Sequence, residues 1–313
     1  MANEITEIAP LSVFITGAIG ALGREVTRQL RAAGHRVTGA TNGYENAAIV
    51  RADGGIPAYP DLMRAGEMRS VMVAAKTDVA INLAPQLANH LPQVPADWDA
   101  RLVNEGVEAL LEAAQDAEVK FVVHASYAFA GEHAEPLDDF LNAVRAGELK
   151  VLTGDEPGCV LRLGFLYGAE SPELSSVRKT LLMGRMIDCG PDDSHTCWIN
   201  VPDAARAVIS AIQARPAGVL LNVVDDQPVS PAGFLHYFAE SQGVTPPGRA
   251  PRFAAWAQPS KFQSALMHLS PHISNAKAKE VLGWSPRFAS HKEAIDDALL
   301  TWRAVAEVGS AAT

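Results

Sequence analysis

The sequence predicts an α/β fold, a doubly wound parallel sheet (Rossmann-like) with a smaller C-terminal region beside it. An apolar segment at residues 11–16 runs directly into a glycine-rich loop. Apolar runs typical of buried strands then alternate with helical patterns up to about residue 165, and the alternation weakens beyond that point. Because parallel strands need long crossover connections, this alternation favours a parallel sheet covered by helices on both faces.

The individual elements can be placed from these patterns. A helix is predicted at residues 24–33, because Val26, Leu30 and Ala33 share one face and Gly34 is a favoured terminator. Later helices are predicted at residues 101–114 and 138–152. Residues 242–252 are rich in proline and glycine and are expected to form a surface connector. Strands are predicted at residues 11–16, 35–38, 56–59, 79–83, 119–124, 159–163 and 219–224.

Composition excludes several classes of protein. The chain has 313 residues, of which 48% are hydrophobic and 20% charged, and its net charge of −10 argues against a general nucleic-acid or anionic-membrane surface. No segment has the roughly 20 apolar residues of a membrane-spanning helix. The acidic first residues lack the pattern of a signal peptide, so we expect a cytoplasmic protein without nucleic-acid or membrane partners.

The cysteines and histidines do not form a metal-binding pattern. Cys159, Cys189 and Cys197 show no C-x-x-C spacing, and the nine histidines include no H-x-x-x-H pair. We therefore expect buried, reduced thiols and no metal site.

The loop FITGAIGALG, residues 14–23, places three glycines between a predicted strand and a predicted helix. That order makes an anion site, because backbone N–H groups and the helix dipole at a helix N-terminus favour negative charge. Gly17 is expected to allow the tight turn, Gly20 to let a pyrophosphate approach the backbone, and Gly23 to let the helix pack close to the strand. A chance run of glycines in a turn is the alternative. The flanking strand and helix favour a dinucleotide site.

The spacing T-G-x-x-G-x-x-G resembles the loop of extended and atypical short-chain dehydrogenases/reductases, the NAD(P)-dependent epimerase/dehydratase family. The resemblance continues through the whole chain. Its further segments are Asp61-Leu62, DVAINLA (78–84), RLVNEGVEALLEAA (101–114), VVHASYAFAG (122–131), CVLRLGFLYG (159–168), CWINVPDAARAV (197–208) and SNAKAKEVLGWSP (274–286). It implies a nucleotide-binding domain mainly in residues 1–165, a substrate-binding region mainly in residues 166–313 with some segments returning to the sheet, and a possible homodimer.

The resemblance also implies the residues that contact an NADP or NAD cofactor. They are Gly17, Ile19, Gly20, Gly23, Arg24, Asn42, Asp61, Leu62, Leu83, Ala84 and Asn104. An NAD enzyme usually places an acid after the second strand, and the stretch VTGATNGY, residues 37–44, has none. This absence favours NADP. Arg24 and Arg36 are candidates to neutralise a 2′-phosphate, or they are solvated surface charges.

The catalytic helix departs from the family pattern. The family uses a tyrosine and a lysine spaced Y-x-x-x-K, with a serine that hydrogen-bonds the same substrate oxygen as the tyrosine. No lysine in this chain has a tyrosine four residues before it. In the helix at residues 138–152, Phe140 takes the tyrosine position, Val144 the lysine position, and Glu148 matches a glutamate that often follows. The family serine is matched by Ser126.

Several neighbouring side chains are candidates for the site. Tyr127 is predicted to supply a phenol, with packing as its alternative role. His124 is expected to point into a packed layer, and Arg162 either pairs with a carboxylate near the site or buttresses the fold. The substrate pocket is predicted to include Phe140, Val144, Tyr167 and Asn200.

Three functions remain open from the sequence. The first is an NADP-dependent reductase that transfers hydride to an unidentified small organic substrate, with the proton supplied by Tyr127, water or the substrate. The second is a catalytically silent NADP-binding regulator or assembly protein. The third is a sugar-nucleotide epimerase or dehydratase, which would need a base in place of the missing pair.

Overall fold

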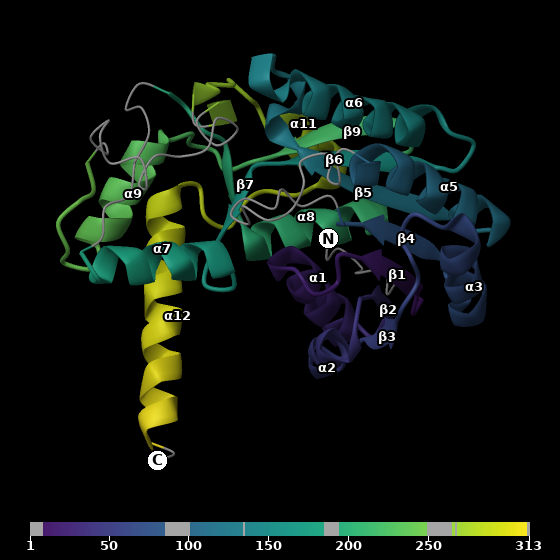
Figure 1. Ribbon diagram of the computed structural model, residues 1–313, viewed down its shortest axis with the longest axis horizontal. Coiled ribbons are helices and arrows are strands. Elements are labelled where there is room, and N and C mark those ends of the chain that lie inside the picture. Colours follow the sequence, from purple (N-terminus) through teal and green to yellow (C-terminus); the bar gives the residue numbers. More distant parts are fainter. Residues whose placement is uncertain are drawn as a thin grey trace, which may run out of the picture.

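The computed structural model describes residues 9–84, 101–133, 135–184, 194–248, 265–266 and 268–311. Its centre is a seven-stranded sheet in the order β3-β2-β1-β4-β5-β6-β9 (Figure 1). Every neighbouring pair is parallel, so the predicted doubly wound sheet is confirmed. The strands are β1 (Ser12–Thr16), β2 (Arg36–Ala40), β3 (Ile56–Ala58), β4 (Val79–Asn82), β5 (Phe121–Tyr127), β6 (Gly158–Leu163) and β9 (Val219–Val223).

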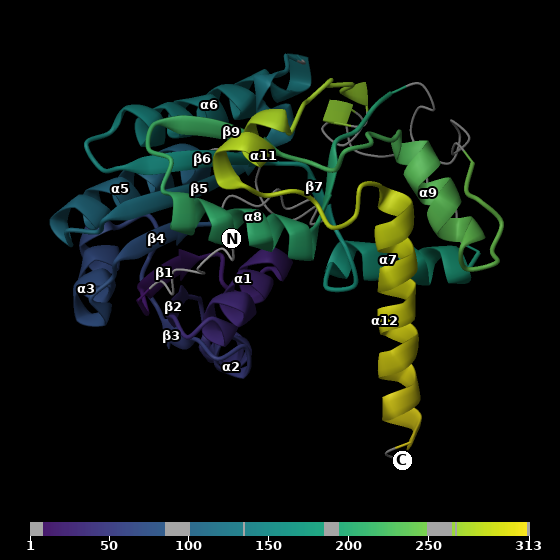
Figure 2. The same ribbon diagram turned by 180° about the vertical axis from the view of Figure 1, so that it is seen from behind.

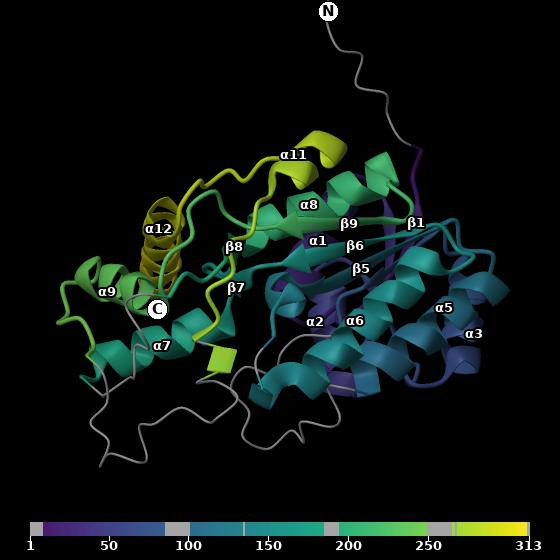
Figure 3. The same ribbon diagram turned by 90° about the horizontal axis from the view of Figure 1, so that it is seen from above.

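Helices cover both faces of this sheet. Seen from above, α3, α5 and α6 lie on one face and α1 and α8 on the other (Figure 3). All five residues of β1 are buried because the strand is covered on both sides. Val13 and Ile15 pack into one core cluster and Phe14 into another, as strand alternation requires. The helices are α1 (Ala21–Ala32), α2 (Tyr44–Ala52), α3 (Ala65–Ala75), α5 (Val107–Asp116), α6 (Asp138–Thr153) and α8 (Val201–Ala214).

Most strands differ from their predicted bounds by one or two residues, and three elements differ more. Helix α1 begins at Ala21 instead of residue 24. The helix predicted at 101–114 opens with a π-helix, η1 (Leu102–Gly106), before α5. Strand β5 starts at Phe121 and continues to Tyr127, because its pairing with β6 extends to the Tyr127–Leu163 pair.

The second half of the chain adds a smaller layer beside the sheet. It contains the parallel strands β7 (Phe165–Tyr167) and β8 (Trp198–Asn200), with α7 (Pro172–Leu182), α9 (Pro231–Glu240), α11 (Ala276–Leu282) and α12 (His291–Ala311). Helix α12 extends away from the rest of the molecule in both side views (Figures 1 and 2). Strand β9 and helix α8 return to the main sheet. The predicted connector is irregular over residues 244–248, and residues 249–252 lie outside the described part.

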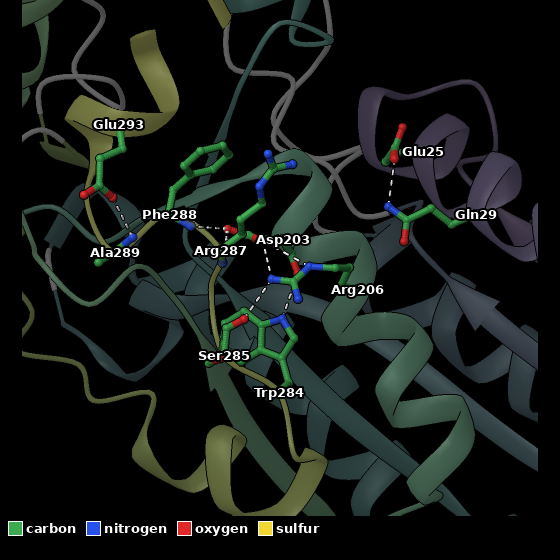
Figure 4. Close-up of polar contacts among 10 residues, drawn as sticks. All are labelled: Glu25, Gln29, Asp203, Arg206, Trp284, Ser285, Arg287, Phe288, Ala289 and Glu293. Atoms are coloured by element: carbon green, nitrogen blue, oxygen red, sulfur yellow. Dashed lines mark hydrogen bonds and ion pairs between the residues drawn. The ribbon is translucent and has the colours of Figure 1, made fainter. Parts of the chain in front are cut away.

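A buried carboxylate fastens the C-terminal segment to α8. Asp203 is 1% exposed, and its Oδ2 accepts the backbone N–H groups of Arg287 (2.8 Å) and Phe288 (3.1 Å). Its Oδ1 pairs with Arg206, and its backbone carbonyl accepts the indole N–H of Trp284 at 3.0 Å (Figure 4). The run VPDAARAV therefore serves as a docking point for residues 284–288.

A second buried carboxylate links β9 to the smaller layer. Asp225 accepts the Tyr167 hydroxyl at 2.7 Å, and its backbone N–H donates to the Trp198 carbonyl at 2.7 Å. Burial, together with the nearby charge of Asp203, raises the pKa of Asp225 to about 8. At neutral pH this link therefore contains a mostly protonated acid.

Helix α6 approaches η1 so closely that only glycine fits at the contact. A Cβ on Gly147 would lie 2.1 Å from the carbonyl oxygen of Val103. We predict that Gly147→Ala lowers the free energy of unfolding by about 1–3 kcal/mol or more, because the two helices must move apart. Gly66→Ala in α3 is the control, since no atom lies within 4 Å of its added Cβ. Urea denaturation measures both, and a Gly147→Ala protein as stable as the wild type would contradict the prediction.

The raised pKa of Asp225 predicts a pH dependence of stability. An unfolded aspartate titrates near pH 4, so between about pH 4 and 8 the folded protein holds a proton that the unfolded chain releases. The stabilisation is complete below this window and is lost as the pH rises through about 8. Asp225→Asn mimics the protonated form, so the variant should gain stability relative to the wild type between pH 5 and pH 8.

Denaturant titrations at the two pH values measure this difference. Asp226→Asn is the matched control, because the hydrogen bond from Asn275 and the ion pair with Lys279 at 2.6 Å lower the pKa of Asp226 instead of raising it. If the free energy of unfolding of Asp225→Asn changes with pH in parallel with that of the wild type, Asp225 is ionised in the folded protein over the whole range from pH 5 to pH 8.

Candidate active site

The glycine loop forms the turn between β1 and α1 and fits only glycine at two positions. Gly17 has φ +69°, and a Cβ there would lie 2.6 Å from the carbonyl oxygen of Leu83. A Cβ on Gly23 would lie 2.1 Å from the carbonyl oxygen of Gly17. Gly23 therefore lets α1 approach the loop itself, whereas we expected it to allow packing of the helix on the strand.

The first turn of α1 offers backbone N–H groups to a ligand. Gly20 is the N-cap residue, no side chain caps the helix, and its first turn contains no acidic residue. Such amides are unsatisfied within the helix and favour an anion. Ile19, Gly20, Ala21 and Leu22 also line the pocket in front of the loop. The geometry thus fits the predicted pyrophosphate site.

Two buried polar atoms fit a ligand with hydroxyl groups. Thr41 Oγ1, just beyond β2, and Asn104 Oδ1, in η1, have no hydrogen-bond partner within the described residues. An unsatisfied buried polar group costs about 1–3 kcal/mol, which a bound ribose or phosphate would remove. Asn104 was predicted to contact the cofactor and Thr41 was not. The signal for Thr41 is a polar side chain at the carboxyl end of a parallel strand.

Arg24 lies beside the loop but is engaged by an acid. Its Nε is 2.8 Å from Asp53 Oδ2, and the hydrogen bond with Asp53 raises the pKa of Arg24. Arg28 lies 3.9 Å from the same carboxylate. Arg36 is the first residue of β2, at the amino end of the sheet, so the structure places it away from the loop at the carboxyl ends. Contact of Arg24 with a 2′-phosphate stays a prediction.

The other predicted cofactor residues occupy turns around the same edge of the sheet. Asn42 is exposed and accepts a hydrogen bond from Asn46 at 2.8 Å. Asp61 accepts the backbone N–H of Met63 at 2.9 Å, and Leu62 packs against the core cluster beneath it. The N–H of Ala84 donates to Thr16 Oγ1 at 3.3 Å. Cofactor contacts of these residues stay predictions.

A pocket of about 160 Å³ opens in front of the loop at the carboxyl ends of β5 and β6. This is where doubly wound sheets bind ligands. Its walls are mostly apolar and aromatic. They comprise Ile19, Gly20, Ala21, Leu22, Leu83, Ala125, Ser126, Tyr127, Phe129, Leu163, Gly164, Phe165, Leu166, Ser171, Pro172 and Glu173. No lysine, arginine or histidine belongs to this lining in the described ranges.

Ser126 is bound to a buried ion pair. Its hydroxyl donates to Glu148 Oε1 at 2.5 Å. Arg162 donates to both oxygens of the same carboxylate, from Nε to Oε1 at 2.8 Å and from Nη2 to Oε2 at 2.6 Å. Ser126 and Arg162 are partners across β5 and β6, and Glu148, which is 3% exposed, reaches them from α6. Arg162 therefore pairs with a carboxylate near the site, which was one of its two predicted roles.

Tyr127 lines the pocket and belongs to an aromatic cluster. Its ring centroid is 5.3 Å from that of Phe129 and 5.6 Å from that of Phe140. Phe140 and Val144 are buried in this cluster, behind the pocket wall that Tyr127 and Phe129 form. The residues in the tyrosine and lysine positions therefore support the aromatic wall. A direct contact between them and the substrate stays a prediction.

Tyr167, Asn200 and His124 are buried outside the pocket lining. Tyr167 is held by Asp225, and Asn200 donates to the Tyr167 carbonyl at 3.4 Å, so contacts of these two residues with the substrate also stay predictions. His124 Nδ1 lies 3.2 Å from the amide nitrogen of Asn82. Burial lowers the pKa of His124 to about 4, which keeps the ring neutral at pH 7 within the packed layer.

Within the described ranges, no helix is both long and apolar enough to cross a membrane. In the same ranges, no three histidine, cysteine or acidic side chains gather where they could hold a metal ion. Cys159 and Cys197 are buried free thiols, and Cys189 lies outside the described residues.

Two curated proteins are similar to this chain over most of their length. A "3-diazoavenalumate denitrifying reductase" from Streptomyces sp. is 28% identical, covering 91% of this chain and 99% of that protein. A "4-hydroxy-2-methyl-3-oxo-4-farnesyl-3,4-dihydroquinoline-1-oxide ketoreductase" from Stigmatella aurantiaca is 26% identical, covering 91% and 95%.

Solved structures share the fold. The UDP-glucose 4-epimerase of Thermotoga maritima, solved with UDP-glucose, superposes with a TM-score of 0.75 at 18% identity over 94% of this chain and 99% of that one. A UDP-glucose-4-epimerase of Stenotrophomonas maltophila, solved with NAD and formylated UDP-arabinopyranose, gives 0.71 at 19% identity over 95% and 99%. Residues 13–148 match the model of the NAD dependent epimerase/dehydratase family. The chain thus resembles this family over residues 13–148 and shares its fold, with a glycine loop between β1 and α1 of a parallel sheet.

Proposed function

We propose that the protein is an NADP-dependent reductase that transfers hydride to a small organic substrate. The observation that carries the proposal is the glycine loop, which opens directly onto a pocket with an aromatic wall. Behind that wall lie Phe140 and Val144, at the positions predicted for the family's tyrosine and lysine. When bound, the nicotinamide cofactor supplies the hydride. The names of the two reductase relatives support the same class of reaction.

The chain's own residues bind the reactants and exclude water. The amides at the start of α1 would hold the pyrophosphate, and Thr41 and Asn104 would bond polar groups of the nucleotide. The substrate would lie between the aromatic wall and the segments at residues 163–166 and 171–173. The first half of the chain would thus provide the nucleotide site, and the second half one wall of the substrate site.

The source of the proton decides which substrates such a pocket can reduce. Ser126 donates its proton to Glu148, and Tyr127 carries a phenolic hydroxyl on the same wall. A carbonyl needs a proton once hydride has been added, and Tyr127 would provide it. An aryl diazonium ion needs none, because the added hydride and the loss of N2 leave the arene directly. The diazo relative is consistent with this second type of substrate.

We also propose NADP as the preferred cofactor. Residues 37–44, at the end of β2, contain no acid that would repel a 2′-phosphate. The guanidinium of Arg24 lies beside the loop, although Asp53 offsets part of its charge.

An epimerase acting on a sugar nucleotide is the second candidate, favoured by the overall likeness to UDP-glucose epimerases. Such a reaction must remove a proton from a sugar hydroxyl, and the substrate's diphosphate calls for basic side chains. The described pocket lining has no basic side chain, which favours the reductase.

The preference for NADP can be tested by adding the missing acid. Asn42→Asp introduces a carboxylate at an exposed position after β2, where it should repel the 2′-phosphate and favour the free ribose hydroxyls of NAD. Calorimetry should show tighter NADP(H) than NAD(H) binding in the wild type and the reverse in the variant. Asn142→Asp, an equal charge change on α6, is the control. A wild type that prefers NAD(H) tenfold, about 1.4 kcal/mol, would contradict the proposal.

Tyr127→Phe tests the proton source, because it removes only a hydroxyl from the pocket wall. We expect carbonyl reduction, followed as NADPH oxidation, to fall about a hundredfold with cofactor affinity unchanged. Reduction of an aryl diazonium salt should be unaffected. Tyr237→Phe is the control, since its hydroxyl contacts Asp296 away from the pocket. If none of the carbonyls, enones, imines or diazonium salts offered leads to NADPH oxidation by the wild type, the catalytically silent regulator becomes the better explanation.

A further inference from the structure

We infer that Glu148 holds Ser126 as a hydrogen-bond acceptor, so that the pocket binds an aromatic compound through its own O–H or N–H group. This inference rests on the proposed function, because it names the substrate class of the same pocket. It reverses the role that the family resemblance implies for Ser126, in which the serine donates to a substrate oxygen.

The direction of the Ser126 hydrogen bond follows from the charge of its partner. Both oxygens of Glu148 accept from Arg162, and a buried carboxylate held by a guanidinium in this forked way is ionised. An ionised carboxylate has no proton to donate. The hydroxyl proton of Ser126 must therefore point at Glu148, 2.5 Å away.

The oxygen of Ser126 is then left with lone pairs for a ligand. Ser126 belongs to the pocket lining, whereas Glu148 and Arg162 do not. Glu148 thus acts only through Ser126 and is a positioning residue. A ligand that meets Ser126 gains a hydrogen bond if it brings a donor and leaves the serine oxygen unpaired if it brings another acceptor.

The rest of the pocket favours the same class of ligand. Glu173, which also lines the pocket, is a second acceptor, and its Oε2 already receives the Ser171 hydroxyl at 2.8 Å. The rings of Phe129 and Phe165 stack with centroids 5.3 Å apart along the wall. Flat apolar walls with acceptors fit a planar aromatic ring that carries a phenolic hydroxyl or an amine.

Phenol and anisole are suitable probes, because they share a ring and differ in one donor hydrogen. We would measure the affinity of each for the protein saturated with NADP+ by ligand-observed NMR titration. The wild type should bind phenol about three- to tenfold more tightly than anisole, the range that one hydrogen bond supplies. Ser126→Ala should bind both probes equally, with the change confined to phenol.

Glu148→Gln should invert the hydrogen bond. With the amide NH2 in place of Oε1, Arg162 keeps only its Nη2 bond to the amide oxygen, the amide N–H donates to Ser126, and the hydroxyl proton is free for the ligand. The preference for phenol should then disappear or reverse in favour of anisole. Glu108→Gln, the same change in the exposed ion pair with Lys150, is the control and should leave the preference intact. A thermal melt of each variant shows whether it is folded. If Glu148→Gln is not folded, the comparison of the wild type with Ser126→Ala decides whether the inference holds.

Equal binding of the two probes by the wild type, tighter anisole binding, or no binding of phenol would overturn the inference. So would a phenol preference that survives in Ser126→Ala, because another acceptor would then be responsible. The assay needs no turnover. A phenol preference in a protein that never oxidises NADPH would therefore count against the proposed function alone, and equal binding in an active reductase against this inference alone.

Discussion

The buried ion pair between Glu148 and Arg162 is the interaction on which the site depends. It joins α6 to β6, and through Ser126 to β5, at the point where these strands open into the pocket. Removing one partner of such a pair typically costs about 3–5 kcal/mol, because the other charge stays buried. The same contact therefore sets both the position of α6 over the sheet and the direction in which the Ser126 hydroxyl donates its hydrogen bond.

The rest of α6 takes a different part in the site. Phe140 and Val144, predicted to match the family's tyrosine and lysine positions, pack with Tyr127 in an apolar cluster behind the pocket wall. Gly147, one residue before Glu148, brings the helix against η1, in which Asn104 keeps an unsatisfied oxygen. One helix thus supplies the carboxylate of Glu148, the apolar support of the pocket wall and the close contact with η1. A substitution that shifts α6 would change all three together.

Much of the fold could be predicted because it depends on patterns local to the sequence. Continuous apolar runs between helical segments identify a parallel sheet, and the glycines identify the turn that Gly17 makes with φ +69°. The π-helix at η1 could not be predicted, because its residues read as an ordinary amphipathic helix. The links from Ser126 to Glu148 and from Arg24 to Asp53 span 22 and 29 positions. Such contacts depend on how the elements pack against one another, and local patterns in the sequence do not indicate that packing.

Hydride transfer within this pocket is the proposed reaction. The most direct measurement uses NADPH carrying deuterium at the transferable C4 position, offered with an aromatic aldehyde and an aryl diazonium salt, with the products analysed by mass spectrometry. We expect one deuterium in the alcohol or in the arene formed. Unlabelled products, or no reduced product from a protein that binds NADPH, would contradict it.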